Sequence, residues 1–189
     1  STTLGLLSGT FAATLGLVAS STASAIAQNI ITPDDTLGSD RSQVTPLDVT
    51  TTRIDGGALQ ESNLFHSFQD FSIGEGLKVY FNNPAEINNI FSRVTGNNPS
   101  EIFGTLGVQG PANLYFINPN GIVFGPNASL SIEGSFSATT ADGITFQDGT
   151  QFSAAAPRRS SPLTVSVPLG LQPGPSSDAT LENNATLRT

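Results

Sequence analysis

The sequence predicts an all-β protein built from short strands, and three observations support this prediction. Charged residues make up only 12% of the 189 residues, whereas the chain holds 19 Gly and 12 Phe, a composition more typical of strands and turns than of helices. Strand candidates recur from about Gln43 to Phe152, divided by Gly, Asn, Asp and Pro. No long stretch has the 3.6-residue periodicity of an amphipathic helix.

Two all-β architectures fit this pattern. Strands with one apolar face, joined by short turns, suit a parallel β-helix, in which each coil buries its inward residues against the next coil. Phe residues recur at intervals of 8 to 13 residues, at positions 81, 91, 103, 116, 124, 136 and 146, as expected for stacking in such a core. A β-sandwich gives similar spacing and remains the alternative on pattern alone.

Residues 1–27 have the pattern of a signal peptide. The stretch from Leu4 to Val18 is apolar or small and uncharged, and the first charged residue is Asp34. Ala25 and Ala27 each end a small-x-small triplet of the kind that signal peptidase cleaves, and we expect cleavage after Ala27. Because the chain begins with Ser and lacks a basic n-region, the signal is interpreted as truncated at its start. A buried core helix is the alternative interpretation of this segment.

Residues 28–156 are predicted to form the folded domain. An apolar run ends at Ile117, Asn118-Pro119-Asn120-Gly121 has turn residues, and Ile122-Val123-Phe124 resumes a strand. Alternating apolar and polar residues then follow between Leu130 and Ala138. The stretch from Pro84 to Val94 is the expected place for a short helix or an irregular excursion, because its apolar residues have helical spacing. Asn-Asn pairs, such as residues 88–89, indicate turns or side-chain ladders.

Residues 157–189 differ in character from the domain. Pro and Ser are frequent in the segment after Ala156, the stretch from Val165 to Pro175 holds three prolines, and the last residues are polar. We therefore predict a Pro/Ser-rich linker followed by a frayed or truncated tail.

Charge and composition exclude several functions. The formal net charge of -8, from 15 acidic and 7 basic residues, repels phosphate backbones, so nucleic acid is not an expected partner. The absence of Cys leaves no disulfide and no thiolate metal site. His66 is the single histidine, which is too few for a multi-histidine metal site, and we interpret it as a packed or surface residue. No cofactor is predicted.

Two long runs carry a family resemblance. The residues NLFHSFQDFSIGEG, at 63–76, and those from Asn82 to Gly125 resemble the haemagglutination-activity, or two-partner-secretion, domain of filamentous haemagglutinin-like exoproteins, with wording closest to cyanobacterial members. The resemblance covers about residues 29–168. Asn118-Pro119-Asn120-Gly121-Ile122 matches one family motif as it stands. The second motif, Asn-Pro-Asn-Leu, is degenerate here, because only Asn83 and Pro84 match it.

The resemblance implies a fold, a route and partners. The fold would be a right-handed parallel β-helix with short extra-helical β elements and an amino-terminal cap. The chain would cross the inner membrane by the general secretory machinery, engage the periplasmic domains of an outer-membrane β-barrel transporter, and reach the surface or exterior of a Gram-negative cell. The parent protein would act as an adhesin, with glycans or cell surfaces as its targets. Unpaired strand edges of the chain before it folds suit recognition by the transporter through β-augmentation.

Two other functions stay open on the residues alone. A carbohydrate-active β-helix enzyme would need carboxylates gathered on one face, with Asp70 and Asp142 as candidates, but no two carboxylates stand at i and i+2. An enzyme is therefore not predicted. A glycan-binding adhesin module would need no catalytic group.

Overall fold

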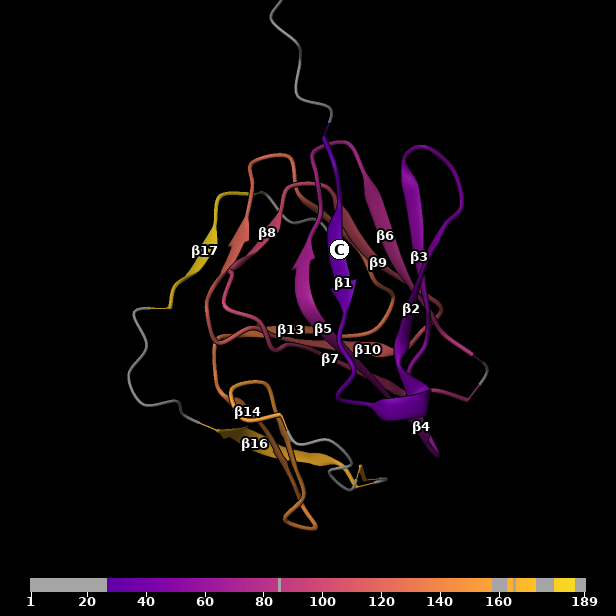
Figure 1. Cartoon of the computed structure of the whole chain (residues 1–189), viewed down its shortest axis with the longest axis vertical. Coiled ribbons are helices and arrows are strands. Elements are labelled where there is room, and N and C mark those ends of the chain that lie inside the picture. Colours follow the sequence, from indigo (N-terminus) through magenta and orange to yellow (C-terminus); the bar gives the residue numbers. More distant parts are fainter. Residues whose placement is uncertain (1–26, 85, 158–162, 165, 173–178, 186–189) are drawn as a thin grey trace, which may run out of the picture.

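The computed structural model describes residues 27–84, 86–157, 163–164, 166–172 and 179–185, and these residues form an almost purely β structure (Figure 1). The one helical element among them is a short 3-10 turn, η1 (Gly38–Asp40). No helix in these ranges has the length and apolar character needed to cross a bilayer.

Three parallel stacks of strands make up the body of the domain. We call them sheets A, B and C. Parallel pairing in sheet A joins β5 (Asn63–Ser72), β7 (Asn89–Val94), β10 (Asn113–Ile117) and β13 (Phe136–Thr139). Sheet B holds β3 (Thr51–Gly56), β6 (Lys78–Asn82), β9 (Thr105–Gln109) and β12 (Ser129–Ser131). Sheet C holds β8 (Ser100–Ile102), β11 (Ile122–Phe124) and β17 (Leu181–Asn183).

The chain visits these sheets in a fixed order. It passes from B to A to C through β6, β7 and β8, and again through β9, β10 and β11. Each passage is one coil, and each strand pairs in parallel with its counterpart in the next coil. This repeat is the parallel β-helix that the sequence predicts, and its parallel pairing differs from the antiparallel pairing of a β-sandwich.

Antiparallel strands close the amino-terminal side of the coil. We call them the cap. β1 (Ile30–Pro33) and β4 (Ala58–Gln60) both pair with β5, while β2 (Ser42–Pro46) pairs with β3. Because these strands cover the edges of the first coil in sheets A and B, its backbone groups are hydrogen-bonded.

A small antiparallel sheet lies outside the coil against sheet A. It consists of β15 (Gln151–Ser153), β14 (Gly143–Phe146) and β16 (Pro168–Gln172). Figure 1 shows β14 and β16 beneath the nearly horizontal strands β7, β10 and β13. We call it the outer sheet, and it corresponds to the extra-helical elements expected from the resemblance.

Sheet A therefore separates two apolar cores. The larger core fills the coil and includes Phe68, Phe71, Phe81 and Phe116. The second lies between sheet A and the outer sheet, where Phe65 and Phe91 pack against residues such as Phe146 and Phe152. Of the phenylalanines expected to stack, residues 81, 91, 116, 124 and 146 are buried, but they divide between these two cores.

Like residues stand above one another on the outer face of sheet A. Phe91 stacks between Phe65 and Tyr115, with ring centroids 5.1 and 4.8 Å away. Two positions earlier along each strand, Asn113 Nδ2 donates to Asn89 Oδ1 and Asn89 Nδ2 donates to Asn63 Oδ1, both at 3.0 Å. Asn89 belongs to one of the Asn-Asn pairs, so the ladder interpretation is confirmed for that pair.

The ladder also holds the segment that precedes β16. Asn63 Nδ2 donates to the backbone oxygens of Thr164 and Ser166, each at 3.1 Å. Two strands of residues 157–189 return to the domain, because β16 pairs with β14 and β17 pairs with β11. The division of the chain at residue 156 remains a prediction. Residues 1–26, including Ala25, lie outside the described residues, and Ala27 is exposed at the start of the described chain.

Of the two alternatives for the stretch from Pro84 to Val94, the short helix is wrong, whereas an irregular segment is present at residues 86–88, before β7 begins. A turn leads into β7, and Ile90, Phe91, Ser92, Arg93 and Val94 are all buried. Because β7 has a core on each face, apolar residues do not alternate with exposed polar ones. This two-sided burial produced the apparent helical spacing.

The aromatic stack gives the first prediction. Phe91→Ala removes a fully buried ring from the middle of the stack, so we expect the free energy of unfolding to fall by about 3–5 kcal/mol. Urea unfolding followed by circular dichroism measures this change. Val49→Ala is the control, because Val49 is 96% exposed and its truncation should change stability by less than about 0.5 kcal/mol. Similar values for the two variants would contradict the second core.

Candidate functional site

The motif predicted from the resemblance forms a corner between sheets A and C. Asn118 follows β10 directly and is fully buried. Its Nδ2 donates to the backbone oxygen of Asn98 at 3.0 Å and to Ser100 Oγ at 2.9 Å. Both acceptors belong to the preceding coil. The Asn118 side chain thus fastens one coil to the previous one at the point where the chain turns.

The other motif residues complete this corner. Asn118 Oδ1 accepts from the backbone nitrogen of Asn120 at 2.9 Å, and the Gly121 nitrogen donates to the Asn118 backbone oxygen at 3.1 Å. Gly121 has φ of +120°, which favours glycine. Ile122 is fully buried and begins β11. Pro119 is half-buried and Asn120 exposed, so the folded motif presents mainly these two residues to the surface.

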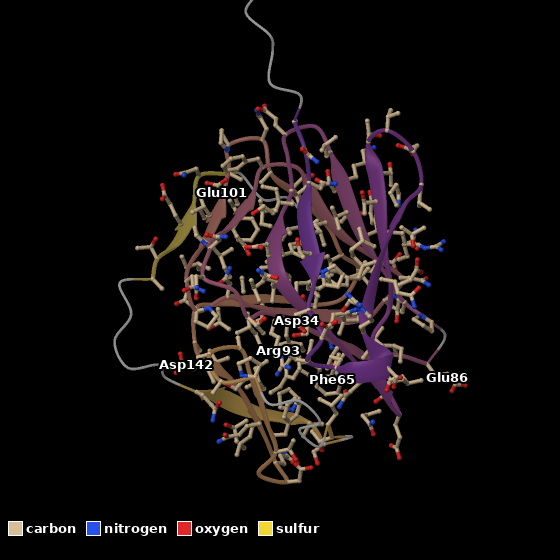
Figure 2. The ribbon with its side chains drawn as sticks, viewed as in Figure 1. Asp34, Phe65, Glu86, Arg93, Glu101 and Asp142 are labelled. Atoms are coloured by element: carbon tan, nitrogen blue, oxygen red, sulfur yellow. The ribbon has the colours of Figure 1, made fainter. Side chains whose placement is uncertain are left out.

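The degenerate motif lies at the opposite end of sheet A. Asn83 and Pro84 follow β6 and lead into β7, whereas Asn118 follows β10. Since the strands of sheet A are parallel, the two motifs occupy different ends of those strands and do not form one site. Glu86, two residues after Pro84, has φ of +78°, a conformation that costs a non-glycine residue energy. Figure 2 shows Glu86 at the edge of the molecule.

A buried polar network, which we call the Arg93 network, joins the cap, sheet A and the outer sheet. Arg93, only 2% exposed, donates from Nε to Ser67 Oγ (2.9 Å), from Nη2 to Thr36 Oγ1 (2.8 Å) and from Nη1 to the Ser153 backbone oxygen (2.7 Å). The two hydroxyls in turn donate to the Asp34 carboxylate, at 2.7 and 2.6 Å. The guanidinium and carboxylate thus interact through two hydroxyl bridges. Figure 2 labels Asp34 and Arg93 next to each other near the centre of the domain.

Burial and hydrogen bonds set the charges of this network. Burial lowers the pKa of Arg93 to about 10, against the opposing effect of Asp34, so the guanidinium is charged at neutral pH. Burial raises the pKa of Asp34, but hydrogen bonds from Thr36, Thr95 and Ser67 outweigh it, and the net shift is downward. The Arg93 guanidinium carbon also lies 4.2 Å from the centre of the Phe152 ring, within the range of a cation–π interaction.

His66 is packed inside the domain beneath the cap. It is fully buried, its Nδ1 lies 3.0 Å from Ser42 Oγ, and its ring contacts that of Phe81 at 5.2 Å between centroids. Its Nε2 is buried without a hydrogen-bond partner among the described residues. Burial lowers the pKa of His66 to about 3. The interpretation of His66 as a packed residue is thus confirmed.

The carboxylates weighed for catalysis serve separate parts of the structure. Asp70 lies in β5 and accepts from Asn98 Nδ2 at 2.8 Å, whereas Asp142 precedes β14 of the outer sheet and its backbone accepts from Ala154. Within the described ranges, no three His, Cys, Asp or Glu side chains gather as a metal ion would require.

Sequence reasoning missed the Arg93 network. Its members are common residue types at positions 34, 36, 67, 93 and 153, and only the coil brings them together. One signal was available: Arg93 stands close to the apolar residues Ile90, Phe91 and Val94, and a charged residue within a buried strand needs partners. Those partners could not be named without knowing the register.

The coil, its cap and the Asn118 corner define a class, the capped parallel β-helix domains. A family model described as "TPS secretion domain" matches residues 29–187, and this chain belongs to that family, as the resemblance implied. The crystal structure of the filamentous hemagglutinin secretion domain is similar in fold, with a TM-score of 0.50 and 23% identity over 64% of this chain and 45% of that chain. The expected right-handed parallel β-helix is thus confirmed.

Two relatives share part of the chain at higher identity. Both are heme/hemopexin-binding proteins of Haemophilus influenzae, one from strain Rd, with 37% and 36% identity over 75 residues. In each comparison the match covers 40% of this chain and 8% of the relative. The chain therefore matches only a small part of these proteins.

The Arg93 network gives the second prediction. Arg93→Met keeps much of the side-chain volume but removes every donor, so the Ser153 oxygen loses this partner and both hydroxyls lose the bond that they accept from Arg93. We expect the free energy of unfolding to fall by about 3 kcal/mol, measured by urea unfolding. Arg41→Met is the control, because Arg41 is half-exposed and pairs with Asp35 at the surface. Its loss should cost less than about 1 kcal/mol, and an equally small loss for Arg93→Met would contradict the network.

The buried His66 gives the third prediction. Its pKa is lower in the folded chain, about 3, than the 6.5 of an unfolded one, so the unfolded state takes up the proton first as pH falls. Stability is therefore lost between pH 6.5 and 3, and by about 2 kcal/mol at pH 5 relative to pH 7. The carboxylates, Asp34 included, lose their contribution at lower pH.

Urea titrations at pH 7 and pH 5 measure this difference. His66→Gln, whatever its own stability, should have nearly the same free energy of unfolding at both values, because this variant lacks the imidazole whose lowered pKa causes the loss. A wild-type chain that is equally stable at pH 5 and 7 would show that His66 takes up a proton in the folded state.

Proposed function

We propose that this secretion domain is recognised in the periplasm by a partner outer-membrane β-barrel transporter and starts β-helix folding outside the cell. In this proposal the general secretory machinery first carries the chain across the inner membrane, and residues 1–27 are then removed after Ala27. The function of the domain is therefore export of the protein that carries it.

One observation carries the proposal: Asn118 is fully buried and bonded to the preceding coil. A side chain so placed has its partners only when two coils are stacked. Because the corner fastens its own coil onto the preceding one, it couples the motif directly to growth of the folded coil. Folding on the far side of the membrane would then oppose return of the chain, since a stacked coil buries apolar residues and satisfies backbone groups.

The unfolded chain offers what a transporter domain could bind. Its strands carry unpaired N–H and C=O groups that suit β-augmentation, with alternate side chains giving selectivity. The motif amides are also free in that state. In the folded domain the cap covers the first edges of sheets A and B, so we assign recognition to the chain before it folds.

The parent protein is proposed to be a large surface or released exoprotein with an adhesive role. The matched Haemophilus influenzae proteins are much longer than the shared segment, which is consistent with a secretion domain attached to a separate functional region. Heme and hemopexin binding is named for those relatives and is not assigned to this domain. A cyanobacterial source remains a prediction from the similarity of the sequence to cyanobacterial members of the family.

The fourth prediction tests the corner in export. Asn118→Ala removes the bonds to the Asn98 oxygen and Ser100, costing about 1–3 kcal/mol, and we expect the chain to accumulate in the periplasm of cells that contain the partner transporter. Fractionation into periplasm and medium measures the effect.

A second variant with the same free energy of unfolding separates a role of the corner in recognition from a general loss of stability. Phe152→Leu weakens the second core, far along the chain from the corner, and can be matched to Asn118→Ala by its unfolding free energy. We expect Phe152→Leu to be exported. Normal export of Asn118→Ala would contradict a role for the corner, and equal retention of both variants would show that stability alone matters.

A further inference from the structure

We propose that Asn120 is a spontaneous deamidation site, open in the unfolded chain and closed by folding of the corner. Asn120-Gly121 is the only Asn-Gly pair in the chain. Glycine has no Cβ to shield its backbone nitrogen, so in an unfolded chain this nitrogen can reach the neighbouring asparagine side chain. The inference concerns a covalent change within the motif rather than its recognition.

The reaction needs only water and the chain itself. The Gly121 backbone nitrogen gives up its proton to solvent base and attacks Cγ of Asn120. A C–N bond closes a five-membered succinimide ring, the Cγ–Nδ2 bond breaks, and ammonia leaves. Water then opens the ring at either carbonyl, which leaves aspartate or isoaspartate at position 120. No oxidation or reduction takes place.

The folded corner withholds each reacting group. The Gly121 nitrogen donates its proton to the Asn118 backbone oxygen at 3.1 Å and lies in a buried residue. Asn120 Nδ2 is held by the Gly96 backbone oxygen at 2.6 Å and lies 3.4 Å from Asn118 Oδ1. Although Asn120 is exposed, its carboxamide is directed to the preceding coil and the attacking nitrogen is engaged.

The product would not fit the corner. An aspartate at position 120 would place a carboxylate oxygen where Nδ2 now donates, opposite the Gly96 oxygen and near Asn118 Oδ1. These three oxygens would have no proton to share between them and would repel one another. Isoaspartate would lengthen the main chain inside the turn, where the Gly121 oxygen accepts from Ser100 at 3.0 Å. A chain that waits unfolded would therefore lose the amide that later closes its own corner. This last consequence for export rests on the proposed function.

The fifth prediction follows the chemistry in the purified 189-residue chain. Samples are held at mildly alkaline pH in native buffer or in unfolding urea, and deamidation at each asparagine is followed by mass spectrometry. We expect Asn120 to react fastest in urea and to react about ten-fold or more slowly in the folded chain, where only opening events expose it. Asn113, followed by Leu, is the internal control. Equal rates in both buffers, or no excess over Asn113 in urea, would overturn the proposal.

Two variants test the mechanism and the consequence. Gly121→Ala in urea, where backbone strain is irrelevant, should slow the reaction at Asn120. Asn120→Asp should lower the urea midpoint of the folded chain more than Asn97→Asp, which adds the same charge at an exposed position of the preceding turn. Equal midpoints would overturn the claim that the product disrupts the corner. None of these measurements uses export, so failure of the transporter proposal would leave them unaffected.

Discussion

Burial of sheet A on both faces is the constraint on which the rest of the structure depends. Its strands lie between the interior of the coil and the outer sheet, so a residue on either face must find a partner within the protein. Parallel, in-register stacking meets this demand by placing like residues above one another. Phe91 therefore lies between two aromatic rings, and Asn89 both donates to and accepts from asparagines of neighbouring coils.

Arg93 shows why a charge is useful in such a sheet. Its planar guanidinium group has donors that point in three directions. They donate to Ser67 in β5, Thr36 near the cap and Ser153 in β15. A buried charge costs desolvation energy, which apolar residues would avoid. In exchange, the geometry of the guanidinium fixes where the cap and the outer sheet sit. The chain has no cysteine, so contacts of this kind take the role that cross-links have in many exported domains.

The sequence was informative wherever a local pattern decided the structure. Short strands, their turns and the repeating coil follow from alternation and from Gly, Asn and Pro, and the corner at Asn118 was found by its match to a motif. The pattern failed at β7, because burial on both faces removes alternation and leaves a spacing that resembles a helix. It also failed at the Arg93 network and at β17, whose partners stand far away in the sequence. Local sequence patterns do not give the register of two strands or the pairing of strands that are far apart in the sequence.

Because Asn118 is buried in the folded corner, a partner could bind its side-chain amide only before the corner folds. Its amide, the Asn118 backbone oxygen and the Gly121 nitrogen are all bonded inside the corner. A partner that binds these groups therefore competes with the fold for the same atoms. Stacking of a second coil would displace such a partner, while a bound partner would delay stacking. If the proposed function holds, competition of this kind would give the transport step a direction, because folding of the corner would release the chain and remove the site to which it was bound.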